Sequence, residues 1–266
     1  MRLSTRRLRF LVRALLLLAA AAAVLILLAD RLPSALLVAP ELRSAKSVLW
    51  VIAHPDDESF FFAPSILGLL GASAARQGSL LCLSVGNHDG LGEVRRRELR
   101  DSCQQLGLER ERCEVLDVPA LPDDPQVWWE TSDVEAAARR YIKQWSVDAI
   151  ISFDAYGVSG HANHRATSEA LRDIALRDPL FPPSFAVSST NVLAKFTSAL
   201  LLPLACFKRG VAALQGQRGA LFVNSWAQYW QARRSFAAHA SQARWFRTLF
   251  VSFSGYMWYV ELERVA

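Results

Sequence analysis

Several features that define other protein classes are missing from this sequence. It has no internal repeat, and neither GxGxxG nor GxxxxGK[ST] follows any predicted strand, which disfavours a nucleotide-binding protein. Only four of the 266 residues are cysteine, and none of them forms a CxxC pair. Because these cysteines are sparse and fall in predicted strands and helices, we expect buried thiols in a reducing compartment.

The net charge of +5 is confined to the N-terminus. Residues 1–31 contain six arginines and one aspartate, whereas residues 32–266 contain 24 basic and 24 acidic residues. Most of the chain therefore lacks the basic field that is typical of a nucleic-acid-binding protein, and we predict no nucleic-acid partner.

A long apolar run follows the N-terminal arginines. Residues 14–29 are uninterrupted apolar residues, and extension back to Phe10 gives about 20, which is enough for a membrane-spanning helix. Arg13 lies near the edge of the run, where its side chain can reach the interface. A cleaved signal peptide is the alternative, but its apolar region is usually shorter. We predict a basic arm and anchor over 1–31, a linker over 32–46 and one domain over 47–266.

Short apolar segments alternate with helical segments in the rest of the chain. We predict strands over residues 47–53, 80–85, 114–118, 149–153, 185–189 and 220–224, and helices over 60–77, 92–107, 127–145, 162–177 and 228–249. This alternation implies βαβ units and therefore a three-layer, Rossmann-like α/β domain with a mostly parallel sheet. Ligands of such sheets bind at the carboxyl ends of the strands, so the reactive residues should directly follow strands.

A histidine and three consecutive acids follow the first predicted strand. His54 and Asp57 are three residues apart and can share one face of the helical turn that begins at Pro55. Imidazole and carboxylate groups are good zinc ligands, and Asp56 should point elsewhere, toward a water on the metal. A helix N-terminus favours one or two acids, but three acids together repel one another unless a cation is present.

A second histidine pair follows the fourth predicted strand. His161 and His164 come after a glycine-containing loop at i, i+3 spacing, so one can complete a metal site while the other reaches a substrate oxygen. The chain has five histidines, and three of them fall in these two motifs. His88, in the loop after the second strand, fits a surface position as well as a ligand position.

With both motifs in view, the sequence resembles the N-acetylglucosaminyl-phosphatidylinositol de-N-acetylases of phosphatidylinositol-glycan class L, within the LmbE-like zinc deacetylase superfamily. HPDDE at 54–58 together with HxxH at 161–164 marks the superfamily, and SQARWFR at 241–247 with FSGYM at 253–257 indicates the lipid-linked branch. The similarity runs from residue 47 to residue 258, which is nearly the whole predicted domain.

The resemblance implies roles for individual residues. His54, Asp57 and His164 would bind Zn²⁺, although Fe²⁺ suits the same ligands. Asp56 would be the general base, and His161 would be the charged acid or oxyanion partner.

Three further residues are substrate-binding candidates. Arg95 matches an arginine that binds the polar end of the substrate in soluble relatives, and Asn87 and Asp89 lie in the preceding loop. For Arg95, a solvated helix face shared with Arg96 and Arg97 is an equally good interpretation.

The implied activity is removal of acetate from N-acetylglucosaminyl-phosphatidylinositol, the second step of GPI-anchor biosynthesis. A deacetylase of a small soluble N-acetylglucosaminide is the nearest alternative, but it would need neither residues 1–31 nor an apolar C-terminal segment. A non-catalytic membrane scaffold of the same fold is the second alternative, and the presence of every expected metal ligand disfavours it. Residues 199–207 and 249–260 are apolar but too short to span a membrane, so each fits the core or the membrane interface.

The expected location is the endoplasmic reticulum membrane, with one spanning helix. The resemblance and the expected free thiols place the domain on the cytoplasmic face. The arginines before the apolar run predict the opposite orientation by the positive-inside rule. We predict the glycolipid and the membrane as partners, and the sequence identifies no protein partner.

Overall fold

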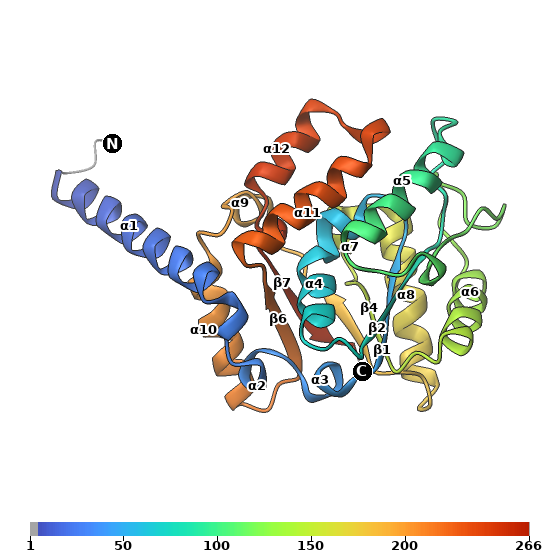
Figure 1. The fold of residues 1–266 in the computed structure, drawn as a ribbon, viewed down its shortest axis with the longest axis horizontal. Helices are drawn as coiled ribbons and strands as arrows, with labels where there is room; N and C mark the ends of the chain where they lie inside the picture. The colour runs from blue at the N-terminus through green and yellow to red at the C-terminus, as the bar shows by residue number, and fades with distance from the viewer. Residues whose placement is uncertain (1–4, 266) are drawn as a thin grey trace.

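The computed structural model describes residues 5–265. Helix α1 (Thr5–Leu27) extends away from the rest of the chain (Figure 1). Within the described residues it is the one helix long and apolar enough to cross a membrane, with a mean hydropathy of 2.7 and most of its surface exposed. The predicted N-terminal apolar helix is therefore present, and its length and composition are compatible with a single-pass membrane protein.

A seven-stranded sheet forms the centre of the domain. Its strands lie in the order β3 (Cys113–Val115), β2 (Gln77–Cys82), β1 (Ser47–Ile52), β4 (Ala149–Phe153), β5 (Ser184–Val187), β7 (Tyr259–Arg264) and β6 (Gly219–Val223). Neighbours among β1 to β5 pair in parallel, and β7 pairs antiparallel with β5 and β6. Every residue of β1 and β4 is buried, as their nearly continuous apolar sequences predict for central parallel strands. The predicted α/β fold with a mostly parallel sheet is confirmed.

Helices cover both faces of the sheet (Figure 1). The main ones are α4 (Ala63–Gly71), α5 (Gly92–Gln105), α6 (Thr131–Gln144), α8 (Ala162–Arg177), α10 (Leu202–Leu214), α11 (Trp226–Ala238) and α12 (Trp245–Phe253). The short α-helices are α2 (Ser34–Leu37), α3 (Pro40–Ser44), α7 (Gly157–Gly160) and α9 (Val192–Lys195), and η2 (Glu58–Phe62) is a π-helical turn. Single 3₁₀ turns lie at η1 (Ala29–Arg31), η3 (Arg110–Arg112), η4 (Ala240–Gln242) and η5 (Gly255–Met257). Helices α5 and α11 pack together on one face, and α6 and α8 pack together on the other. This is the predicted three-layer arrangement.

Three predicted segments differ from the structure. The expected linker, 32–46, is folded: Leu42 is fully buried, and Val38 forms an isolated bridge with Ala220. The helix expected over 228–249 is two helices, because the chain turns after Ala238 to bury His239. The helix expected over 60–77 ends at Gly71, because residues 77–82 are needed to pair with β1.

The predicted free thiols are wrong for two of the four cysteines. Cys103 near the end of α5 and Cys113 at the start of β3 form a disulfide, with their Cα atoms 6.5 Å apart. The tight turn at Gly107 (φ +85°) reverses the chain between them, so residues ten apart in sequence meet. In the described part of the chain Cys82 and Cys206 are free. Because two of the four cysteines are paired, the cysteines no longer support a reducing compartment.

Candidate active site and metal centre

The candidate site lies where the strand order changes direction. Strands β1, β2 and β3 follow one another toward one edge of the sheet, whereas β4 returns to the other side of β1. The loops that leave the carboxyl ends of β1 and β4 therefore separate around one crevice, which is where open α/β sheets bind ligands. The first loop carries His54, Asp56 and Asp57, and the second leads to His161 and His164 at the start of α8.

Three histidines from these two loops meet in one place. One ring nitrogen from each of His54, His161 and His164 lies within 4.8 Å of the others. Asp57 lies between two of them: its Oδ1 is 3.3 Å from His164 Nε2, and its Oδ2 is 4.0 Å from His54 Nδ1. The structure thus brings together the three proposed metal ligands, His54, Asp57 and His164, and places His161 beside them.

The hydrogen bonds of the histidines indicate which nitrogens are free to bind a metal. His164 Nδ1 donates to the carbonyl oxygen of Gly157 at 3.0 Å, which leaves its Nε2 lone pair facing Asp57. His54 Nε2 lies 3.1 Å from both Asp123 Oδ1 and Asn163 Oδ1. Because both partners are acceptors, Nε2 carries the proton, and Nδ1 is the free nitrogen facing Asp57. His54, Asp57 and His164 therefore present three converging donor atoms, each held by a second contact.

Asp123 was not identified from the sequence. It lies in the long loop after β3, and its carboxylate lies beside His54 in the manner of the outer carboxylate that orients a metal-binding histidine. Burial alone would raise the pKa of Asp123, but its contacts with His54 and Arg95 outweigh this and lower it. The rule that reactive residues follow parallel strands points to this loop, but it does not select Asp123 over Asp117 or Asp124.

His161 is placed by a strained loop. Val158 has φ +61°, which is rare for a β-branched residue, and its backbone N–H donates to the Ser189 hydroxyl at 2.8 Å. Gly157 (φ +68°) must lack a side chain, because a Cβ there would lie 2.6 Å from the Cβ of His164. Such strain is typical of a functional site.

The protonation state of His161 differs from the one expected. Burial and the nearby imidazoles of His54 and His164 lower the pKa of His161 to about 4. Its Nδ1 accepts a hydrogen bond from the Asn163 N–H at 3.2 Å, so the neutral ring carries its proton on Nε2. The resting form is thus a neutral N–H donor, and not the imidazolium that the sequence comparison implied.

Asp56 has an unusual backbone conformation and a cationic partner. Its φ is +109°, and its backbone N–H donates to Glu58 Oε2 at 3.0 Å. Its carboxylate is buried and forms an ion pair with Arg247 of α12. Burial raises the pKa of Asp56, which Arg247 only partly counteracts, and a raised pKa suits a general base. Arg247 was quoted in the C-terminal motif but was given no role, since 191 residues separate it from Asp56.

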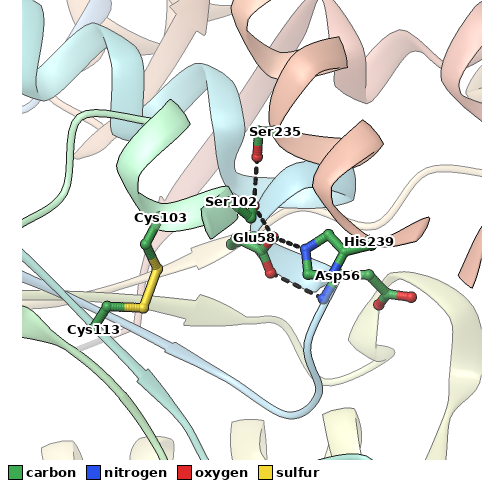
Figure 2. Close-up of a disulfide and its surroundings, with 7 residues drawn as sticks. All are labelled: Asp56, Glu58, Ser102, Cys103, Cys113, Ser235 and His239. Carbon is green, nitrogen blue, oxygen red and sulfur yellow. Dashed lines mark hydrogen bonds and ion pairs between the residues drawn. A yellow bond between two sulfur atoms is a disulfide. The ribbon is translucent and has the colours of Figure 1, made fainter. Parts of the chain in front are cut away.

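A buried polar network supports this backbone conformation (Figure 2). Glu58 accepts hydrogen bonds from Ser102 at 2.5 Å and from His239 Nε2 at 2.6 Å, and Ser102 also contacts Ser235 at 2.6 Å. Both Glu58 and His239 are fully buried. Although burial opposes charge on both groups, their mutual attraction lowers the pKa of Glu58 and raises that of His239. Glu58 thus links the packed helices α5 and α11 to the backbone of Asp56.

The substrate-binding candidates have different environments. Arg95 is buried, so the solvated-face interpretation is wrong, and its guanidinium donates to the carbonyl oxygens of Gly86 at 2.9 Å and Pro55 at 2.8 Å. It therefore joins the loops after β1 and β2.

The neighbouring loop contains the other two candidates. Asn87 accepts from the Gly92 N–H at 2.9 Å at the start of α5, and Asp89 is exposed in the same loop. The proposed roles of Asn87 and Asp89 in substrate binding remain predictions. His88 is exposed, which fits the surface interpretation, and its backbone N–H contacts Asp123.

The donor set fits a divalent metal of the zinc type. Two imidazoles and one carboxylate match the three protein ligands of a catalytic zinc site, which leaves a position for water or substrate. Burial raises the pKa of Asp57 as it does that of Asp56, because neighbouring buried carboxylates are costly to ionise. A divalent cation would offset that cost.

Comparisons with known proteins agree with the geometry. The family model described as PIG-L, GlcNAc-PI de-N-acetylase, matches residues 49–175. A relative from Bos taurus named N-acetylglucosaminyl-phosphatidylinositol de-N-acetylase is 38% identical over 212 residues, which cover 79% of each chain. A probable enzyme of the same name from Schizosaccharomyces pombe is 33% identical over 220 residues, covering 82% of this chain and 86% of its own. The solved N,N'-diacetylchitobiose deacetylase from Pyrococcus horikoshii, at 16% identity, covers 79% of this chain and 77% of its own with a TM-score of 0.54, and so shares the fold.

Proposed function

This chain belongs to the N-acetylglucosaminyl-phosphatidylinositol de-N-acetylase family, and on that premise we propose that its site removes acetate from N-acetylglucosaminyl-phosphatidylinositol. The products are glucosaminyl-phosphatidylinositol and acetate, in the second step of GPI-anchor biosynthesis. The observation that carries the proposal is the convergence of His54, Asp57 and His164 beside Asp56 and His161. The comparisons provide the substrate class, since both relatives are named for this substrate.

The chain's own residues supply the acid–base chemistry. When bound by His54, Asp57 and His164, Zn²⁺ (or Fe²⁺) would polarise the acetamide carbonyl and acidify a water. Asp56 accepts the proton of the attacking water, and its ion pair with Arg247 fixes the carboxylate in position. The Nε2–H of His161 donates to the carbonyl oxygen as negative charge develops there. Asp56 then returns the proton to the leaving amine.

The two alternative functions have less support. A deacetylase of a soluble N-acetylglucosaminide would share the site, but the exposed apolar helix α1 is unnecessary for a soluble substrate. A non-catalytic scaffold would not need the Asp56 carboxylate to be held in a positive-φ conformation by a buried network.

The test of the function is release of acetate from the lipid-linked substrate in vesicles. We expect the purified full chain to release it, to contain about one equivalent of metal and to become inactive with a chelator, because the acidified water is then lost. Added Zn²⁺ should restore the rate. His54→Ala should show no such restoration, whereas substitution of the exposed His88 by Ala should behave as wild type. Faster hydrolysis of a water-soluble N-acetylglucosaminide than of the glycolipid would favour the first alternative.

The proposed location is the endoplasmic reticulum membrane, with α1 as the anchor and the domain on the cytoplasmic face. The family resemblance supports this orientation. The N-terminal arginines and the Cys103–Cys113 disulfide favour the opposite face.

Protease treatment of sealed microsomes tests the orientation. We expect a C-terminal tag to be digested without detergent, because a cytoplasmic domain is accessible from outside the vesicle. A lumenal marker protein should stay intact in the same sample as a control for sealing. Protection of the tag until detergent is added would instead place the domain in the lumen.

A further inference from the structure

Helix α12 exposes four large apolar residues and directs the guanidinium of Arg247 inward. Trp245, Phe246, Leu249 and Phe253 share one face, and all four are exposed, Trp245 by 77%. Arg247 points the other way, to Asp56, and Val251 is buried. An ordinary surface helix of a soluble domain has the reverse arrangement, with its polar side facing water.

Helix α9 extends this apolar surface. Val192 and Leu193 are exposed by 68% and 84%, which is unusual for two adjacent aliphatic residues. Phe196, just after α9, contacts Phe250 of α12 with ring centroids 5.9 Å apart, and the Ser198 N–H donates to the Phe253 carbonyl at 2.8 Å. We name Val192, Leu193, Trp245, Phe246, Leu249 and Phe253 the apolar face.

The apolar face lies directly over the candidate site. The inner side of α12 provides Arg247 to Asp56, and Phe250 packs against Phe60 and Phe61 of the turn that follows the HPDDE motif. One short helix therefore contacts the general base on one side and exposes aromatic rings on the other.

We propose that the apolar face inserts into the interfacial layer of a lipid bilayer, as a second membrane contact besides α1. The occupant is a bilayer because the acyl chains of a lipid-linked substrate stay in the membrane while its sugar reaches the site; this step rests on the proposed function. Exposed Trp, Phe and Leu on one face of a short helix are the side chains that enter this layer. Helix α1 contacts α10 of the same domain, so an α1 inserted in the membrane would hold the domain at its surface.

Photolabelling of the wild-type chain tests the contact directly. The full chain is placed in vesicles of phosphatidylcholine and phosphatidylinositol that contain a photoactivatable apolar reagent, and labelled peptides are mapped. We expect label in α1 and in residues 245–253, but not at Leu176 and Leu180, which are exposed apolar residues at the end of α8 and beyond. Label in α1 without label in residues 245–253 overturns the proposal, and label in neither overturns the anchor as well.

Kinetics with matched variants provide a second measurement. The double variant Trp245→Ser, Phe246→Ser should lower kcat/KM at least tenfold for N-acetylglucosaminyl-phosphatidylinositol in vesicles. It should leave turnover of the deacylated, water-soluble form of that substrate unchanged. The control Leu176→Ser, Leu180→Ser should change neither. An equal loss on both substrates would show that the rings support the site itself, which contradicts the proposal. Failure of the wild type to hydrolyse either substrate would refute the proposed function, while the photolabelling result would still decide the membrane contact.

Discussion

Asp56→Asn should lower kcat roughly 100- to 10,000-fold, the range expected for loss of a general base. The amide has nearly the same shape and can still accept a hydrogen bond from Arg247, but it cannot take a proton from water. The three proposed metal ligands remain, so metal content should stay near one equivalent. The measurement is acetate release together with metal analysis of the same preparation.

Asp57→Asn is the matched control for Asp56→Asn, since it changes the neighbouring carboxylate in the same way. We expect it to lose metal as well as activity, because Asp57 lies between His54 Nδ1 and His164 Nε2. If Asp56→Asn lost its metal and Asp57→Asn kept it, the roles of the two aspartates would have to be exchanged.

Glu58→Leu should have the largest effect on stability. Leucine would leave the His239 ring, the Ser102 hydroxyl and the Asp56 N–H without their shared acceptor in a fully buried position. Removal of one member of a buried ion pair costs about 3–5 kcal/mol. For a domain of this size that corresponds to a fall in Tm of about 6–20 °C. Thermal unfolding measured by circular dichroism would detect it.

Two controls separate this effect from a general loss of charge. Glu93→Leu removes an exposed carboxylate paired with Arg96, and surface pairs are worth at most about 1 kcal/mol. Glu58→Gln keeps the shape and an acceptor oxygen, so its Tm should lie between those of wild type and Glu58→Leu. A Tm for Glu58→Leu equal to that of Glu93→Leu would refute a structural role for the network.

The sequence predicted the structure well where reactive residues directly follow a parallel strand. The boundaries of β4 and α8 agree with the predicted ranges, because the apolar run of β4 ends before Asp154 and α8 begins after its N-cap residue His161. The HPDDE and HxxH motifs could be placed together because parallel strands end at the same edge of a sheet.

The sequence was a poor guide where a contact joins distant segments. Nothing in the local pattern shows that Arg247 reaches Asp56, or that His239 is buried against Glu58, since these contacts depend on how α11 and α12 return to the site. The disulfide was missed for a similar reason, because a helix, a turn and a strand must form before the two thiols meet. The antiparallel strand β7 was missed because only its first two residues belong to the apolar stretch 249–260, and it continues into the mostly charged residues 261–264.

The segment that carries α12 is held at both ends. Before the helix, the backbone N–H and the hydroxyl of Ser241 donate to the Glu98 carboxylate at 2.7 and 2.6 Å. After it, the Asn224 N–H donates to the Trp258 carbonyl at 2.7 Å, where the chain joins the sheet. Because α12 is held on both sides, we expect it to stay fixed over the site and not to open as a lid. If the apolar face lies in the bilayer as proposed, the sugar headgroup would enter the site beneath α12, parallel to the membrane plane. The height of the amide above the acyl chains would then be a criterion of substrate choice.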